Sequence, residues 1–323
     1  MKLPAFVLLF LITCTANGQQ SSHDLKHVYT YTWEDCDCTH ARFTTVLVYT
    51  DSGWHRTDYF VHGPTVRMDG WYEDSAAQIP NGPFVYTYPD KKIDSVGRYL
   101  HGKKEGLWMA WHYNGMIADS TVYSSGNPIG TSLGFYPSGR IKDSVFYRAD
   151  GSGVRYTWYN NGTLAAAGVL AADGKKTGRW KYWHDNGKFA AVELYDHDSL
   201  LEHQYFDENG QPSDTGRKDR VANFKGGSKA WLDWLNNNVI WPEKYKITGA
   251  DTAVVAFSIT VDESGKLTDV YVSNAAFPQF EKVALRAIRH SPKWEPAIGH
   301  NRRIPYHFRQ SVVFTQTHKT TPS

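Results

Sequence analysis

Three side chains able to bind a metal stand close together near the N-terminus: Cys36, Cys38 and His40. On a β-strand they would share one face, because alternate residues point the same way. Two thiolates and an imidazole could begin a zinc or copper site. No partner motif elsewhere adds ligands, and in an exported protein a disulfide or two unreactive thiols explain the pair equally well. The three residues are therefore weak metal candidates, and we expect neither a metal nor another cofactor.

Histidines and carboxylates also recur in the middle of the chain, where His112, His184 and Asp185 lie within similar ten-residue blocks. The two histidines occupy the same position of their blocks, which indicates a shared structural role and not one catalytic centre. The sequence has no G-x-S-x-G, H-E-x-x-H or phosphate-binding loop. We expect no catalytic residues and predict that the protein is not an enzyme.

The blocks themselves are the strongest pattern in the sequence. Gly106–Gly115 reads GLWMAWHYNG and Gly178–Gly187 reads GRWKYWHDNG, with two looser copies between them and a weaker one after. The closing glycines are separated by 24, 23, 25 and 23 residues. A fixed period of this length is typical of stacked units, none of which can bury its apolar face alone. The five closing glycines are Gly115, Gly139, Gly162, Gly187 and Gly210.

Each unit reads as a β-hairpin of about 23 residues. An Asn-Gly or Ser-Gly pair ends the block, and such pairs favour tight turns because both residues tolerate a positive φ. An apolar residue follows two positions after the first four closing glycines, as at Ile117 and Phe189. A further copy precedes these blocks at Gly82–Lys91, and Thr44–Gly53 is a more distant candidate.

The G-x-W-x-x-W-x-x-N-G pattern resembles the MORN-repeat family in its bacterial form, over roughly residues 82–210. The resemblance implies a long antiparallel sheet of successive hairpins without enzymatic machinery. The aromatic residue at block position six is the most regular, so we predict a structural core role for it. The less regular rings are the better candidates for stacking on a ligand such as a glycan. The core set is Trp111, Phe135, Trp158, Trp183 and Phe206; the ligand-stacking set is Trp108, Tyr113, Tyr159 and Trp180.

A polar, glycine-bearing segment at residues 213–227 is predicted to be a linker, and a different pattern follows it. Residues 228–238 and 280–290 carry apolar residues at helical spacing. Residues 253–261, 267–273 and 304–314 alternate as strands, with a turn at Asp262–Gly265. The order α-β-β-α-β predicts a three-stranded antiparallel sheet with helices on one face.

This region resembles the TonB C-terminal domain over about residues 224–314. The carrying motifs are Phe224-x-Gly226-Gly227, Asn238-x-x-Trp241-Pro242 and above all Pro292-Lys293-Trp294-x-Pro296-Ala297. In the family, this domain sits in the periplasm and binds a peptide of an outer-membrane transporter, which adds as a strand at the sheet edge. The resemblance makes the last strand the expected edge and Trp294 a structural core residue. The predicted partner-binding residues are Tyr306, Phe308, Arg309, Gln310 and Val312.

The opposite reading is that this edge is capped within the protein or pairs in a homodimer, because open edges are a liability. A true TonB-type energy transducer is an alternative function, but it would keep a membrane helix and a proline-rich spacer. Here Ala5–Ile12 is a short apolar run after Lys2, typical of a cleaved signal peptide ending near Gly18. Cys14 lies in a loose lipobox, so lipidation there is the alternative that would bring membrane contact.

We therefore predict a mainly β protein with a C-terminal α+β domain. The expected parts are a signal peptide (1–18), a β-rich region with possible degenerate repeats (19–80), the repeat array (81–212), the linker (213–227), the TonB-like domain (228–316) and a tail (317–323). From Arg217 onward the chain carries 16 Lys and Arg against 9 Asp and Glu, but no nucleic-acid motif accompanies this charge. The expected function is an exported, non-enzymatic binding or scaffold protein of the periplasm or outer-membrane surface. The expected partners are envelope proteins, with an outer-membrane transporter as one candidate. A glycan-binding array is a further alternative.

Overall fold

The computed structural model describes residues 24–29, 34–36, 41–61, 65–213, 219–242, 245–247, 252–274 and 278–316. Within them lies a 15-stranded antiparallel sheet, followed by a region with a 3-stranded antiparallel sheet and two helices. The large sheet contains β1 (Asp24–Tyr29), β2 (Phe43–Thr50), β3 (Gly53–Phe60), β4 (Thr65–Tyr72), β5 (Pro80–Thr87), β6 (Ile93–Leu100), β7 (Lys103–Trp111), β8 (Ile117–Ser124), β9 (Asn127–Phe135), β10 (Ile141–Tyr147), β11 (Gly153–Trp158), β12 (Leu164–Leu170), β13 (Lys176–Trp183), β14 (Phe189–Asp196) and β15 (Ser199–Tyr205).

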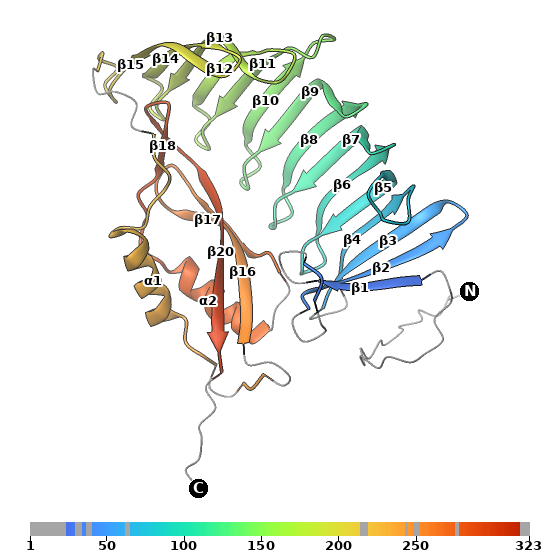
Figure 1. Ribbon diagram of the computed structural model, residues 1–323. Helices are drawn as coiled ribbons and strands as arrows, with labels where there is room; N and C mark the ends of the chain where they lie inside the picture. The colour runs from blue at the N-terminus through green and yellow to red at the C-terminus, as the bar shows by residue number, and fades with distance from the viewer. Residues whose placement is uncertain are drawn as a thin grey trace, which may run out of the picture.

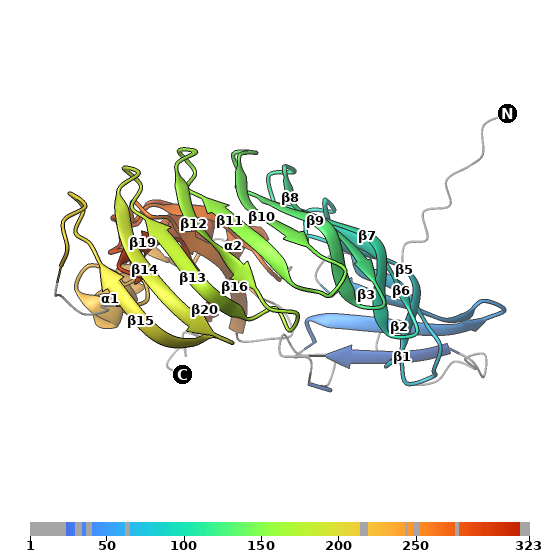
Figure 2. The same cartoon turned by 90° about the horizontal axis from the view of Figure 1, so that it is seen from above.

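The strands of this sheet pair strictly in chain order, from β1 to β15. The predicted hairpin array is therefore confirmed as a fold, and the N-terminal strands β1–β4 continue the same sheet. The sheet bends into an arch, and the C-terminal region lies on the inner side of that arch (Figure 1; Figure 2 shows the same arrangement from above). We call the surface of the sheet that looks toward the C-terminal region the inner face.

The turn that closes the block at Gly106–Gly115 differs from the one that its Asn-Gly pair predicts, because only the glycine, and not Asn114, adopts a positive φ. Gly115 has a φ of 87°, and its N–H donates a hydrogen bond of 2.7 Å to the carbonyl of His112. In the β5–β6 hairpin Lys91 stands at the glycine position and adopts the same left-handed conformation, with a φ of 72°. A lysine is strained in this conformation relative to glycine, so this hairpin keeps the turn of the other blocks without their closing glycine.

Successive repeats are joined by a row of side chains at block position seven. Each donates its hydroxyl or ring N–H to the main-chain carbonyl of the position-six residue one repeat later, over 2.7 to 3.1 Å. These hydrogen bonds join equivalent positions of successive hairpins. They therefore favour a nearly constant number of residues per repeat. The position-seven row and its acceptors are Tyr88 to Trp111, His112 to Phe135, Tyr136 to Trp158, Tyr159 to Trp183 and His184 to Phe206.

Two tryptophans at block position three are buried and cover glycines on the preceding strand. Trp108 is 6% exposed and Trp180 is 3% exposed. A methyl group added to Gly97 would lie 2.0 Å from the Trp108 ring, and one added to Gly168 would lie 2.1 Å from the Trp180 ring. Because the glycines leave room for flat contact, these two tryptophans are core residues. Their predicted role as exposed stacking rings is thereby corrected.

The position-six rings are less buried than their predicted core role requires. Trp111, Phe135, Trp158, Trp183 and Phe206 are each only half-buried, and none belongs to the two clusters of buried residues in the array. Four of these residues are the last of their strand, and each pairs with the apolar residue that begins the next strand. The fifth, Phe206, directly follows β15. The most regularly spaced aromatic residues therefore lie at the ends of the hairpin strands, and the most deeply buried rings lie elsewhere.

The C-terminal region is a compact α+β unit. Its sheet has the order β17 (Leu267–Val272), β16 (Thr252–Val261), β20 (Tyr306–Thr315), and helices α1 (Gly227–Asn238) and α2 (Pro278–Arg289) supply residues to the core on one side of it. A small hairpin, β18 (Ala297–Gly299) and β19 (Arg302–Ile304), projects from it. Trp294 is 8% exposed and packs between Phe224, Trp231 and Phe308.

The segment predicted as a linker is partly built into this unit. Arg220 pairs with Ile298 and Asn223 pairs with Glu295 as isolated antiparallel bridges. Phe224 is 6% exposed within the C-terminal core, so residues from 219 onward belong structurally to the domain. Neither helix of the described residues has the length and apolar character that crossing a bilayer requires.

Candidate protein-interaction site

The last strand of the C-terminal sheet has an open edge. Among the described residues, β20 pairs only with β16, along the whole stretch from Tyr306 to Thr315. A groove of about 200 Å³ runs beside its second half, lined by residues from both faces of β20 and by the end of α1. Most of its lining residues are apolar, although the surface that they expose to the groove is more polar than apolar: Leu235, Val239, Trp241, Val312, Val313 and Phe314, with Asn236 and Thr315. An unpaired strand edge beside an apolar groove can receive an extended peptide.

The side chains of β20 divide between the two faces of the sheet. Tyr306, Phe308 and Val312 pack against or within the domain's own core, and Gln310 accepts a long hydrogen bond of 3.4 Å from Trp231 Nε1. Arg309 is exposed, as is Val313, whose side chain is 59% exposed at the groove. Of the predicted partner-binding residues, Arg309 is thus the one placed to touch a partner by its side chain. Val313 was missed, although strand alternation places it with Arg309.

The other face of the domain contacts the position-seven row of the array. Tyr271 packs edge-on against Tyr88, with ring centroids 5.1 Å apart, and stacks on Tyr113 at 5.1 Å with 5° between the ring planes. Asp269 lies 3.6 Å from Nδ1 of His112. The hydroxyl oxygen of Tyr136 lies 3.2 Å from Oε1 of Glu263.

Arg302 donates to the hydroxyl of Tyr159 over 3.3 Å, so the contacts continue along four successive members of the row.

The turn between β18 and β19 inserts into the end of the array. His300 stacks on Tyr182 at 4.1 Å, and its Nδ1 lies 2.8 Å from the fully buried carboxylate of Glu193. The Asn301 amide donates to the main-chain carbonyls of Ala190 and Phe206, over 3.1 and 2.7 Å. Both turn residues have a positive φ, of 53° and 57°. The sequence analysis missed this turn because its flanking strands are only three residues long.

Burial changes the protonation of groups at this contact. Burial raises the pKa of the Glu263 carboxyl, although the Tyr136 hydroxyl bonded to it acts in the other direction. Burial also raises the pKa of the Tyr136 hydroxyl, and Glu263 adds to that rise. For His112, burial lowers the pKa, but the bonds to Asp269 and to the Phe135 carbonyl outweigh it and leave the pKa raised. The contact is thus most favourable when Glu263 and His112 carry their protons.

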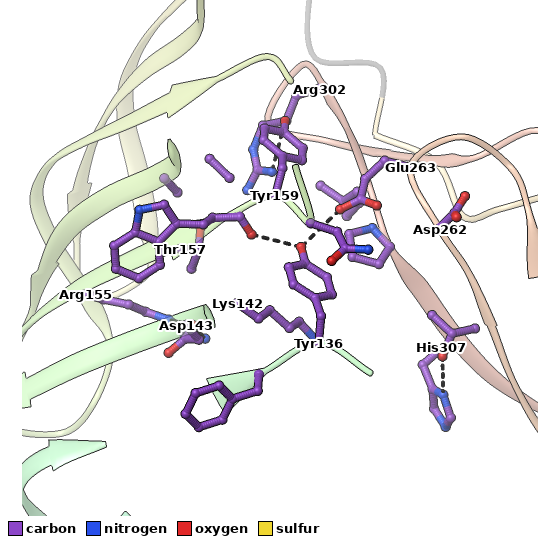
Figure 3. A pocket seen from close by; sticks show the side chains of 18 of the residues that line it. Tyr136, Lys142, Asp143, Arg155, Thr157, Tyr159, Asp262, Glu263, Arg302 and His307 are labelled. Atoms are coloured by element: carbon purple, nitrogen blue, oxygen red, sulfur yellow. Dashed lines mark hydrogen bonds and ion pairs between the residues drawn. The ribbon is translucent and has the colours of Figure 1, made fainter. Parts of the chain in front are cut away.

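A cavity of about 870 Å³ lies between the inner face and the C-terminal domain. Tyr136, Tyr159 and Arg155 line it from the array, and Glu263 and Arg302 line it from the domain (Figure 3). The hydroxyl of Tyr136 bridges the two parts, because it donates to the Trp158 carbonyl at 2.8 Å and lies 3.2 Å from Glu263.

The remaining predicted site residues are not gathered at one place. Tyr159 is 3% exposed within the position-seven row, and Tyr113 is occupied by its stacking on Tyr271. These placements correct the expectation that the two rings form an exposed stripe for a ligand. Cys36 is half-buried, whereas Cys38, His40 and Cys14 lie outside the described residues. No group of three or more potential metal ligands occurs among the residues described.

The C-terminal region thus combines an open edge strand, a groove beside it and a small α+β sheet. Residues 241–315 match the family model of the Gram-negative bacterial TonB protein C-terminal. The match spans β16, β17, α2 and β20 and supports a TonB-like protein-interaction module, typical of Gram-negative envelope proteins and of a non-enzymatic domain family. No curated protein matches the chain.

Proposed function

We propose that the protein is an exported, non-enzymatic scaffold of the bacterial envelope that captures an extended segment of an envelope protein at the β20 edge. The observation that carries the proposal is the unpaired edge of β20 beside the groove of Leu235, Val239 and Trp241. Main-chain hydrogen bonds would supply affinity, and the apolar groove would select the side chains of the added strand. The match of residues 241–315 to the TonB C-terminal family supports the same use.

The array has the role of a platform in this proposal. It contacts the domain through the position-seven row and the His300–Asn301 turn, whereas the groove is built only from α1, the segment after it and β20. No residue of the array lines the groove, so the contact between domain and array leaves the groove open. The MORN-like assignment of the repeats and the export of the chain are part of the proposal.

The test is site-specific crosslinking in cells that make the protein. A photo-crosslinking amino acid at Val313 is expected to yield an adduct with an envelope protein, mapped by mass spectrometry to an extended segment. The same amino acid at Leu232, exposed on α1 outside the groove, is the matched control. A synthetic peptide of the mapped segment should bind the full chain, and Val313→Glu should weaken binding at least tenfold. Equal crosslinking from both positions, or unchanged peptide binding by Val313→Glu, contradicts the proposal.

A further inference from the structure

The turn that closes the last block of the array is built differently from the turns before it. Asn-Gly pairs close four of the blocks, at Asn114, Asn161, Asn186 and Asn209, and all four asparagines are exposed. The first three turns are each followed by a further hairpin, whereas the fourth comes after β15, the last strand of the large sheet. Because water reaches all four asparagines, the hydrogen bonds of their side chains are what distinguishes them.

In the three earlier turns, both polar atoms of the asparagine side chain are held by hydrogen bonds. The side-chain oxygen accepts from the N–H of the residue after the closing glycine, over 2.8 to 3.1 Å. The side-chain nitrogen donates to a main-chain carbonyl in the turn of the following repeat, over 2.7 to 3.0 Å. These side chains therefore cannot rotate without breaking two hydrogen bonds.

The side chain of Asn209 lacks both of these restraints. The N–H of Gln211, the residue after the closing glycine, donates instead to Oδ1 of Asp207 over 2.9 Å. No strand of the large sheet follows β15, and within the described residues the Asn209 side chain interacts only with the Asp207 carboxylate of its own turn. The main chain is still held, because Lys188 donates to the Asn209 carbonyl over 3.1 Å. The last turn therefore keeps its position while its asparagine side chain is able to rotate.

An asparagine that precedes glycine is chemically reactive when its side chain can rotate. The main-chain nitrogen of the glycine attacks Cγ of the asparagine, and the absence of a glycine side chain leaves the approach unobstructed. The Cγ–Nδ2 bond breaks, and the amide nitrogen leaves as ammonia with the proton that the attacking nitrogen loses. Water then opens the cyclic imide at either of its two carbonyl groups, which gives aspartate or isoaspartate. The glycine N–H donates within its own turn in all four blocks, over 2.7 to 2.9 Å, so the side-chain restraints alone should separate the rates.

We propose that Asn209 is a modification site at which the folded chain deamidates, with water as the co-reactant, before the asparagines of the earlier turns react. The product adds a carboxylate next to Asp207 and Glu208. Glu208 already pairs with Arg303 of the C-terminal domain at 3.2 Å. The reaction therefore adds a negative charge at the end of the array, beside the domain. The inference goes beyond the proposed function and does not depend on peptide capture at β20.

The test follows the purified full chain in mildly alkaline buffer, at a temperature well below that of unfolding. Peptide mapping by mass spectrometry gives the deamidation rate at each of the four turns. Asn209 is expected to react at least fivefold faster than Asn114, Asn161 and Asn186, which are the matched controls within the same molecule. In the chain unfolded by guanidinium chloride the four rates should become similar, because the hydrogen bonds that distinguish the sites are absent.

The same peptide map identifies the route of the reaction. Both aspartate and isoaspartate are expected at position 209, because the imide opens at either carbonyl group, and aspartate alone would contradict the imide route. Equal rates at the four turns of the folded chain, or a faster reaction at any of the three earlier turns, overturn the proposal. A folded chain in which Asn209 stays intact, under conditions in which the unfolded chain deamidates there, overturns it as well.

Discussion

The outer and the central repeats of the array use the same hairpin for different purposes. In the outer repeats, Trp108 and Trp180 lie over Gly97 and Gly168 and build two buried clusters. In the central repeats the same block position holds Ser132 and Arg155, and a cavity opens beside Arg155. The comparison shows that departure from a repeat consensus, and not agreement with it, indicates where an array is specialised.

The largest expected effect tests the packing of the outer repeats. Gly168→Ala should lower the free energy of unfolding by about 2–3 kcal/mol, because its Cβ would overlap the Trp180 ring. Gly134→Ala in a central repeat is the matched control, since its Cβ would meet Asp143 at 3.3 Å, and it should cost less than about 1 kcal/mol. Urea unfolding measures both, and equal losses would remove the distinction between the two kinds of repeat.

A second prediction concerns the turn that anchors the domain to the last strands. Asn301→Gly removes two hydrogen bonds to carbonyls of the array without straining the positive φ of 57°. We expect a loss of about 1–2 kcal/mol. Ser125→Gly, at another turn residue with a φ of 50°, should be neutral. Hydrogen exchange on β14 should rise only in the Asn301 variant, and unchanged protection would show that this turn does not hold the domain.

Removal of one oxygen atom, the Tyr136 hydroxyl, should weaken the contact between the C-terminal domain and the central repeats. Tyr136→Phe removes the hydroxyl that bonds the Trp158 carbonyl and Glu263, and it should cost about 1 kcal/mol. Tyr156→Phe, whose ring is 44% exposed, should cost less than about 0.3 kcal/mol. Thermal unfolding of the two variants beside the wild type decides between them. If the two losses are the same, the Tyr136 hydroxyl does not connect the domain to the array.

The smallest expected effect is a dependence of stability on pH. Because the pKa of His112 is raised above 6.5 in the folded protein, its contribution is complete below about pH 6.5 and is lost as pH rises through the raised value. We expect the melting temperature to fall in this range, corresponding to less than about 1 kcal/mol. His112→Gln should flatten that dependence, whereas the exposed His203→Gln should retain it. A flatter wild-type profile than that of His112→Gln would contradict the prediction.

Strand order and the C-terminal elements could be predicted from the sequence because both depend on local signals. Asn-Gly turns and alternating apolar residues define the hairpins, and the helix and strand periods of residues 228–314 match the observed elements closely. The resemblance to the TonB C-terminal domain predicted in addition that β20 lies at the edge of its sheet.

The environment of the aromatic rings could not be predicted from regularity alone. The glycines Gly97 and Gly168 that admit the tryptophans lie on neighbouring strands, and only the pairing register brings ring and glycine together. The docking of the C-terminal domain on the array also could not be predicted from local sequence patterns. It depends on contacts such as that between Tyr88 and Tyr271, which are far apart in the chain and individually ordinary.

The position-seven row has a consequence for how this protein can change over evolutionary time. Repeat arrays commonly gain or lose whole units, because each unit contacts only its neighbours. Here four members of the row each contact a different residue of one domain: Tyr88, His112, Tyr136 and Tyr159. Deleting one hairpin would displace later contacts by about two strand spacings, or roughly 9–10 Å. The contacts to the domain therefore fix how many hairpins can lie between Tyr88 and Tyr159.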